Sequence, residues 1–493
     1  MLTPRHSTRI RLDNFGIPTA CPATPPGLTS SSPAPWCPAT WFPLDHPSRK
    51  SLSGHRGQSR LVSRTKGWVS GLKGRIYYGW FVAIATAGAE FGNAASAIAI
   101  LTVFVNPMTE EFGWSRTQIS GATSVGAIFG AALAPFTGRL VDRFGSRLIL
   151  TVGGLALAAS CFYLAAAQTL GGFYIAFSIA RTADQGMIKI GTLPVVAKWF
   201  QVYRGRAMAL VSFIGLLGVI VMAPVVHMVI EAWGWRVAWV MLGSIMILIG
   251  VLPSALIVRR QPEDMGLTID GITAAPPSDG VLGLNEDNPT GGESDQTWTL
   301  RQVIRTQAFW LILVSLFVIS IANAGVVLHL IPHLTEQGLS EGSAVGAISV
   351  FSTSAAAATL LLGILTERVS PRLMMLFGYM LAASAMFVLI IADTIFEAYL
   401  FAVIQGAAAG GINVLAPILL ASYYGRRVLG SIYGIVRSAQ VVGFATGTLL
   451  SGIVYDATGS YRNAFESFLI IAVVSSTMML LARRPKPAVA DPV

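Results

Sequence analysis

The sequence predicts an all-α membrane protein in which twelve transmembrane helices form two pseudo-symmetric six-helix bundles. Three observations lead to this expectation: the composition, the recurrence of long apolar stretches, and an internal repeat. Of the 493 residues, 53% are hydrophobic and only 12% are charged, and the mean hydropathy is +0.63. A water-soluble protein of this size carries about twice that charged fraction. The composition therefore excludes a soluble globular enzyme.

Apolar stretches long enough to cross about 30 Å of hydrocarbon, roughly 20 residues each, recur from Tyr77 onward with short polar breaks between them. Glycine and alanine are frequent in these stretches, which lets helices approach closely within a lipid bilayer. The expected helices cover residues 77–105, 117–138, 147–168, 171–196, 205–230, 237–258, 308–332, 343–365, 372–392, 396–422, 428–452 and 464–482.

The two halves of the chain contain a repeated segment. Residues 138–147 reappear 225 positions later as residues 363–372, with the glycine, the acidic residue and both final arginines in register. Two homologous six-helix bundles in one chain are typical of transporters that place the solute site between the bundles near the membrane midplane. The expected domains are an N-terminal bundle (75–260), a polar and acidic cytoplasmic linker (261–306), a C-terminal bundle (307–484) and a short tail (485–493). The last part of the linker, residues 298–307, predicts a short interfacial helix.

The positive net charge of +10 belongs almost entirely to the N-terminal region. Residues 1–77 hold eleven Lys and Arg against two acidic residues, so the composition indicates no nucleic-acid partner. Residues 1–74 are rich in Pro, Ser and Arg and lack a signal-peptide core, which predicts a disordered tail. Adhesion to an anionic cytoplasmic leaflet and a start codon assigned too far upstream are the two open explanations of this tail.

The distribution of Lys and Arg between the loops predicts the orientation. Seventeen lie in one set of loops and the C-terminal segment, whereas the opposite loops hold Arg116, Arg236 and Arg462. By the positive-inside rule, the first set and both termini lie in the cytoplasm. We expect a multi-pass protein of the plasma membrane or the bacterial inner membrane.

The repeated segment carries a motif. Its first copy contains Gly138, Asp142, Arg143, Gly145 and Arg147 in the spacing G-x-L-x-D-R-x-G-x-R. This motif resembles the loop between helices 2 and 3 of the major facilitator superfamily. In that superfamily the aspartate contacts the start of helix 11, here near residues 428–431, and closes the inner gate.

The second copy sits where that superfamily repeats the motif, and we include Gly363, Glu367, Arg368 and Arg372 in the gating motif. Other segments narrow the resemblance, namely Tyr78-Gly79-Trp80, Trp199-Phe200 and Arg260 to Gly266. Together they resemble the monocarboxylate porter and oxalate/formate antiporter branch. The sequence departs from that branch on helix 8, where an arginine of the relatives is missing from residues 343–365.

Ionisable residues inside a bilayer are costly and therefore indicate function. Three expected helices carry them: the first has Glu90 and Asn93, the fourth has Arg181, Asp184, Gln185 and Lys189, and the eleventh has Arg437 and Gln440. We expect Arg437 and one of Arg181 or Lys189 to bind an organic anion from opposite halves, because a guanidinium matches a carboxylate with two hydrogen bonds. The resemblance supports this assignment, since a basic residue on helix 11 belongs to the branch's anion site. Asn93, Gln185 and Gln440 are expected to complete the site.

Two alternatives remain open for these residues. Arg181 and Asp184, one turn apart, could simply neutralise each other. Proton coupling requires a carboxyl group whose pKa is raised by burial, and Glu90 is the first candidate because no cation lies within one turn of it, with Asp184 second. Glu90 could instead be a polar residue satisfied by Asn93 or by a facing helix. His329 and His333 could form a proton relay or metal pair, but such histidines more often contact interfacial water, so neither joins the expected site.

These observations predict a secondary active transporter of a small organic anion, a mono- or dicarboxylate, that works by alternating access. Proton symport and anion exchange both fit, so the expected partners are the anion, H⁺ and the bilayer, with a monomeric functional unit. The alternatives are a proton-coupled exporter of amphiphilic drugs or metabolites and a solute receptor that does not transport. No enzyme activity, cofactor or metal is expected, because the sequence shows no nucleophile and base pair, metal-ligand spacing or phosphate-binding Gly-Lys motif.

Overall fold

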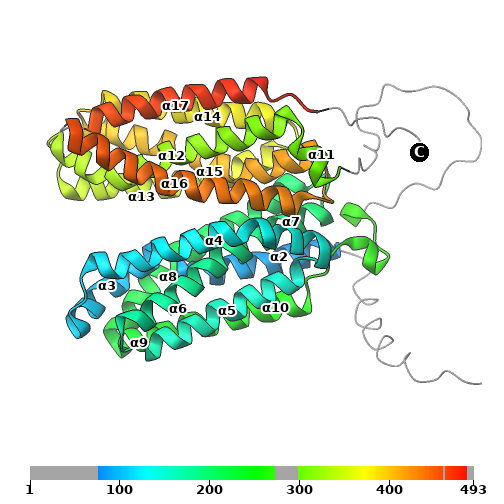
Figure 1. Ribbon diagram of the computed structural model, residues 1–493, viewed down its shortest axis with the longest axis horizontal. Helices are drawn as coiled ribbons and strands as arrows, with labels where there is room; N and C mark the ends of the chain where they lie inside the picture. Colours follow the sequence, from blue (N-terminus) through cyan, green and yellow to red (C-terminus); the bar gives the residue numbers. More distant parts are fainter. Residues whose placement is uncertain (1–75, 272–297, 459–460, 486–493) are drawn as a thin grey trace, which may run out of the picture. The chain divides into compact units, whose positions relative to one another are not determined.

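The computed structural model describes residues 76–271, 298–458 and 461–485. Within these ranges the regular structure is entirely helical. The expected tail at residues 1–74 and most of the acidic linker lie outside the described residues. The predicted twelve-helix fold is confirmed over the described ranges, where twelve helical paths follow one another (Figure 1).

The first six paths form the N-terminal bundle. In chain order they are α2 (Tyr78–Gly92) with η1 (Asn93–Ser96) and α3 (Ile98–Phe112), α4 (Arg116–Phe144), α5 (Ser146–Ala166), α6 (Leu170–Ala183) with η2 (Asp184–Ile188) and α7 (Lys189–Trp199), α8 (Arg204–Trp233), and α9 (Trp235–Ile245) with η3 (Met246–Val251) and α10 (Leu252–Leu256).

The C-terminal bundle contains the other six paths, which are unbroken. They are α12 (Gln307–Glu336), α13 (Glu341–Leu365), α14 (Pro371–Ile390), α15 (Ile395–Tyr424), α16 (Leu429–Thr458) and α17 (Tyr461–Leu481). Two short 3-10 turns, η4 (Pro262–Met265) and η5 (Ile269–Gly271), follow the first bundle, and α11 (Leu300–Ile304) precedes the second. The short helix expected over residues 298–307 is therefore present as α11, which Thr299 and Gln302 cap reciprocally.

Three paths of the N-terminal bundle are interrupted where the sequence predicts continuous helices. The first path breaks after η1, where Ala97 is extended. The fourth and sixth paths each contain a π-helical turn, η2 and η3. Such turns insert a residue into the helical ladder and are frequent at functional sites. In the fourth path, the turn begins at Asp184 and includes Gln185, two of the expected site residues.

Ten helical segments of the described residues are long and apolar enough to cross a membrane. The two paths that do not meet this standard are residues 170–199 and α16. These are the paths that carry Arg181, Asp184 and Lys189, and Arg437, respectively. The polar residues that lower their apolarity are therefore the same residues that the sequence assigns to the candidate site.

The two bundles contact each other through α4 against α16 and α8 against α13. Both contacts depend on glycine. A Cβ atom on Gly138 of α4 would overlap the carbonyl oxygen of Gly430, and one on Gly205 of α8 would overlap the carbonyl oxygen of Gly363. The repeated motif therefore brings backbone against backbone at two symmetry-related places. We call this end of the bundles the motif end.

The segment after α10 folds onto the motif end of the N-terminal bundle. The Asp270 carboxylate accepts hydrogen bonds from the backbone N–H groups of Gln201 (2.9 Å) and Val202 (2.8 Å), just before α8 begins. Burial and the nearby Asp270 carboxylate raise the pKa of the Tyr77 hydroxyl. The hydroxyl therefore stays protonated and donates to the Thr268 carbonyl oxygen (3.1 Å), which holds this segment against the start of α2.

Candidate functional site

A partly buried ion pair joins the first and fourth paths of the N-terminal bundle. The Lys189 ammonium group lies 2.7 Å from Glu90 Oε2, and the Thr192 hydroxyl donates to Glu90 Oε1 at 2.7 Å. The side chain of Glu90 is only 6% exposed. Sequence reasoning missed Thr192, although it lies one turn after Lys189 and hence on the same helical face. Glu90 has no cation in its own helix, as expected, but α7 supplies one.

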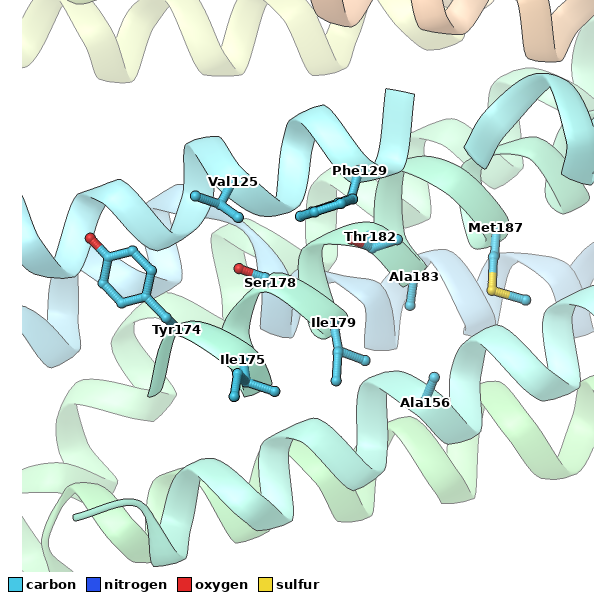
Figure 2. Close-up of a pocket in the computed structure, with 10 residues that line it drawn as sticks. All are labelled: Val125, Phe129, Ala156, Tyr174, Ile175, Ser178, Ile179, Thr182, Ala183 and Met187. Carbon is cyan, nitrogen blue, oxygen red and sulfur yellow. The ribbon is translucent and has the colours of Figure 1, made fainter. Parts of the chain in front are cut away.

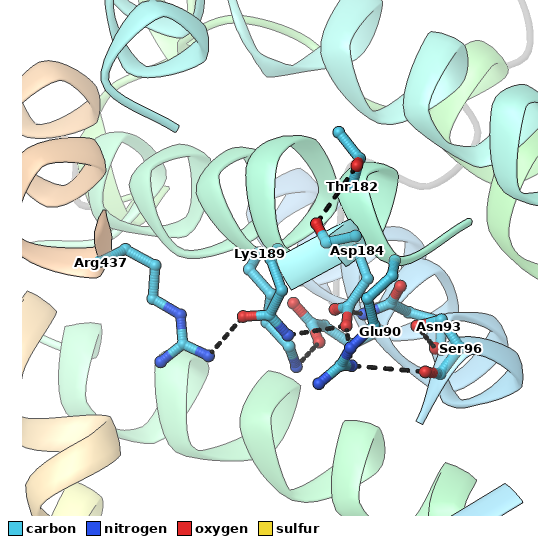
Figure 3. Close-up of polar contacts among 10 residues, drawn as sticks. Glu90, Asn93, Ser96, Thr182, Asp184, Lys189 and Arg437 are labelled. Atoms are coloured by element: carbon cyan, nitrogen blue, oxygen red, sulfur yellow. Dashed lines mark hydrogen bonds and ion pairs between the residues drawn. The ribbon is translucent and has the colours of Figure 1, made fainter. Parts of the chain in front are cut away.

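A cluster of hydrogen-bond donors surrounds the second buried carboxylate, that of Asp184, at the π-helical turn (Figure 3). Asp184 Oδ2 accepts hydrogen bonds from Arg181 Nη1 (2.6 Å) and Gln185 Nε2 (2.7 Å), and Oδ1 accepts from Asn93 Nδ2 (2.7 Å). Arg181 Nη1 also donates to the Ser96 carbonyl oxygen (3.3 Å), at the break in the first path. The interruption of that helix thus exposes a carbonyl group to a cation, as in other broken transmembrane helices.

Arg437 of the C-terminal bundle faces this cluster. Its Nη2 donates to Gln185 Oε1 (3.0 Å), and its Nη1 lies 3.5 Å from Gln440 Oε1 on its own helix. Its Nε atom is buried and has no hydrogen-bond partner among the described residues. No carboxylate of the described ranges forms an ion pair with Arg437. Two amide oxygens thus accept from part of the guanidinium group, and its Nε donor is left without a partner among the described residues.

The expected site residues are therefore brought together. The expectation that Arg181 or Lys189 is free to bind the anion together with Arg437 does not match their pairing in the structure. Arg181 and Lys189 do not present spare positive charge, because Asp184 and Glu90 neutralise them. The open alternative that Arg181 and Asp184 pair within one helix matches the structure. Asn93 is likewise engaged with Asp184. The uncompensated charge of the cluster is that of Arg437.

A separate cavity of about 450 Å³ lies between α4, α5 and α6 (Figure 2). Its lining is almost entirely apolar, and its outer residues Phe129 and Ile175 are 60% and 65% exposed. Exposed apolar side chains of this kind fit a surface that faces lipid. The cavity offers no charge to an anion, so we do not assign the site to it.

At the motif end, Asp142 caps the first turn of α16. Its Oδ1 accepts a hydrogen bond from the Gly430 N–H (2.9 Å), and its Oδ2 accepts from the Ser431 N–H (2.7 Å) and hydroxyl (2.6 Å). The positive end of a helix favours a carboxylate at this position. The aspartate of the first motif copy therefore contacts the segment that the resemblance indicated. Two cations that the sequence analysis did not assign to the gating motif lie beside it. Lys198 Nζ is 4.0 Å from Oδ1, and Arg260 donates to the Asp142 carbonyl oxygen (3.1 Å).

The second motif copy makes the corresponding contact with the start of α8. Glu367 Oε2 lies 2.7 Å from Arg206 Nε, and its Oε1 accepts from the Arg206 N–H at 3.3 Å. Arg372 donates to the carbonyl oxygens of Met479 (3.3 Å) and Leu480 at the end of α17. Both motif copies thus place an acidic side chain at the N-terminus of a helix in the other bundle.

Three arginines of the motif make no ionic link within the described ranges. Arg143 and Arg147 are exposed and form no ion pair there, although two motif arginines so close to Asp142 could have done so, and Arg368 is also exposed without an ion pair. They lie at helix ends, where water solvates a guanidinium group at little cost. Gly145 has its expected structural role, since its φ of +84° lets the chain turn from α4 into α5.

Removing the charge of Asp142 should open the motif end. In Asp142→Asn, the loss of a carboxylate at the start of α16 costs about 0.3–2 kcal/mol. The ratio of closed to open protein should therefore fall by up to about thirtyfold. A cysteine at Ala134, which is fully buried next to Gly434 of α16, reports this opening through its rate of modification by a thiol reagent, in a background without the native cysteines. The exposed Asp393→Asn serves as the control, and equal rates in both variants would remove Asp142 from the contact that holds this end closed.

No group of three or more His, Cys, Asp or Glu side chains that could hold a metal ion occurs in the described part of the chain. His333 is buried and its ring packs against Phe465. The side chain of His329 lies outside the described residues. The possible metal pair of these two histidines therefore gains no support.

Comparisons with known proteins agree with this geometry. The family model of the Major Facilitator Superfamily matches residues 82–356 and 330–492. The chain is 22% identical over 396 residues to the oxalate:formate antiporter of Oxalobacter formigenes, covering 80% of this chain and 88% of that protein. It is 24% identical over 413 residues to monocarboxylate transporter 11 of Mus musculus, covering 80% and 85%.

Solved structures show the same fold. The human organic anion transporter MFSD10 superimposes with a TM-score of 0.62 at 13% identity, over 81% of this chain and 99% of that one. The transporter FucP in its outward conformation superimposes with a TM-score of 0.61 at 14% identity, over 82% and 99%. The bundles, the repeated motif and the family model that covers most of the chain lead to one conclusion: this protein belongs to the Major Facilitator Superfamily.

Proposed function

We propose that this membrane transporter moves a small monocarboxylate by alternating access and that Arg437 binds the carboxylate group. The observation that carries the proposal is the half-buried guanidinium group of Arg437 at the contact between the bundles, which has no carboxylate partner among the described residues and whose Nε atom is buried without a hydrogen-bond partner. A carboxylate would satisfy its open Nε donor and form the two-point contact that guanidinium groups favour. The similarity to an oxalate:formate antiporter and to monocarboxylate transporters supports the same class of substrate.

The charge of the cluster favours a monoanion. Arg181, Lys189 and Arg437 supply three positive charges, and Glu90 and Asp184 supply two negative charges. One positive charge remains, and a monocarboxylate neutralises it. A dicarboxylate would leave a net negative charge in a low-dielectric site unless Glu90 or Asp184 took up a proton. Proton uptake would therefore accompany a dianion more strongly than a monoanion.

The contacts at the motif end support a gate. Asp142 and Glu367 each hold the start of a helix of the opposite bundle, so separating the bundles at this end requires both contacts to break. The excess of Lys and Arg in the loops of this end places it, in our proposal, in the cytoplasm. In this proposal, the two contacts close the carrier toward the cytoplasm.

The test is uptake into proteoliposomes of radiolabelled formate, lactate, oxalate and a cationic amphiphile, with and without an inward proton gradient. We expect saturable uptake of formate or lactate, and oxalate uptake that depends more steeply on external pH. The control is Arg301→Ala, which removes an exposed cation on α11. Arg301 is far in sequence from the cluster, so this variant should transport as the wild type does.

The alternatives predict other results in the same assay. An exporter of amphiphiles would move the cationic probe and none of the three acids. A receptor would bind a carboxylate at equilibrium but show no flux in either direction. Either outcome would overturn the proposed function.

A further inference from the structure

We propose that Gln185 is an internal substitute for the substrate. Its amide oxygen accepts a hydrogen bond from Arg437 in the empty carrier and is displaced when a carboxylate binds. The inference rests on the proposed function and concerns how the empty carrier returns across the membrane. It assigns to Gln185 a positioning role that differs from direct substrate binding.

The geometry of Gln185 fits this role on both sides of its amide. Its Oε1 accepts from Arg437 Nη2 at 3.0 Å, and its Nε2 donates to Asp184 Oδ2 at 2.7 Å. Rotating the amide by half a turn would place its NH₂ group against a guanidinium group, so the chemistry fixes the orientation. The side chain is 7% exposed. Gln185 thus links a carboxylate of the N-terminal bundle to the cation of the C-terminal bundle.

An amide oxygen resembles a carboxylate oxygen as a hydrogen-bond acceptor but lacks its charge. It can therefore satisfy the guanidinium group of an empty carrier. A carboxylate can displace it, because the carboxylate adds a negative charge that attracts the guanidinium and a second oxygen that completes a two-point contact. The π-helical turn helps, since Asp184 and its neighbour Gln185 both direct their side chains into the cluster.

The consequence concerns two modes of transport. Exchange of one anion for another requires only the loaded carrier to reorient, whereas net uptake also requires the empty carrier to return. Without Gln185, the empty carrier would move with the half-buried guanidinium group of Arg437 poorly satisfied, which is costly inside a membrane. The loaded carrier would be unaffected, because the substrate itself occupies Arg437.

The experiment compares net uptake with exchange in proteoliposomes, with radiolabelled lactate as the probe. Net uptake is measured into vesicles without lactate, and exchange is measured into vesicles preloaded with unlabelled lactate. In Gln185→Leu we expect exchange within about threefold of the wild type and net uptake at least about tenfold slower. Lactate should also bind more tightly, since no side chain competes for Arg437. Gln185→Met, which keeps the length of the side chain without the amide, should behave in the same way if the leucine variant folds poorly.

Gln185→Glu provides the opposite change. Its carboxylate would occupy Arg437 permanently, so lactate affinity and exchange should both fall at least about tenfold. The inference fails if net uptake and exchange decrease by the same factor in the leucine and methionine variants, or if these variants bind lactate more weakly than the wild type. If the wild-type protein shows neither lactate uptake nor exchange, the proposed function fails first, and this inference fails with it.

Discussion

Replacing Arg437 by alanine is expected to abolish carboxylate transport while leaving the protein folded. Removing one partner of a buried, hydrogen-bonded charge pair costs about 2–5 kcal/mol, so the affinity for the anion should fall by at least about thirtyfold. The substitution leaves Gln185 without one hydrogen bond but creates no unpaired charge, because the described residues give Arg437 no carboxylate partner. Folding should therefore change little. Initial rates of lactate uptake, measured over a range of concentrations, check this expectation.

Two controls make that result specific. Arg437→Lys keeps the charge but loses the planar fork, and it should retain weak transport with a raised KM. Gln440→Ala removes only a long contact of 3.5 Å and should change uptake by no more than a few-fold. Transport at the wild-type rate in Arg437→Ala would show that the anion binds elsewhere.

Replacing Glu90 by glutamine is expected to destabilise the protein and to remove accumulation driven by a proton gradient. Lys189 would keep its charge without the carboxylate that lies 2.7 Å away. The loss of one partner from a fully buried pair costs about 3–5 kcal/mol, and we expect about 1–3 kcal/mol here because the Lys189 side chain is 35% exposed. Glutamine also carries no proton that it can release, so Glu90 could no longer couple uptake to the gradient.

A double-variant comparison separates the two effects. Glu90→Gln with Lys189→Met removes both charges and should recover most of the lost thermal stability in detergent, because the stability effects of substitutions at contacting residues do not add. It should not recover the accumulation of lactate above equilibrium under an inward proton gradient. Full accumulation in Glu90→Gln would exclude Glu90 as the proton carrier and leave Asp184 as the remaining candidate.

Much of this fold follows from local sequence patterns. The lengths of the apolar stretches predict the helices, and the motif at residues 138–147, through its resemblance to a known family, predicts the contact of Asp142 with the start of α16. The pair formed by Arg181 and Asp184 could also be anticipated, since one helical turn separates the two residues. Patterns of this kind depend on residues that are neighbours in sequence or that belong to a recurring motif.

The pairing of residues on different helices could not be predicted from such local patterns. Glu90 and Lys189 are 99 positions apart, and nothing in either segment specifies which face of one helix meets the other. The link from Gln185 to Arg437 depends in addition on a π-helical turn, and a hydrophobic pattern does not show where one residue is inserted into a helix. The sequence therefore predicted a set of polar residues that the structure brings together, but not which of their charges lack a partner among the described residues.

The central claim is that Arg437, which has no carboxylate partner among the described residues, binds the carboxylate of the substrate. Equilibrium binding of radiolabelled lactate to the purified protein tests it most directly, with wild-type protein, Arg437→Ala and Arg301→Ala measured at the same pH and salt concentration. We predict saturable binding to the wild type and to Arg301→Ala, and a loss of at least about thirtyfold in Arg437→Ala. Equal affinity of all three proteins would contradict the account.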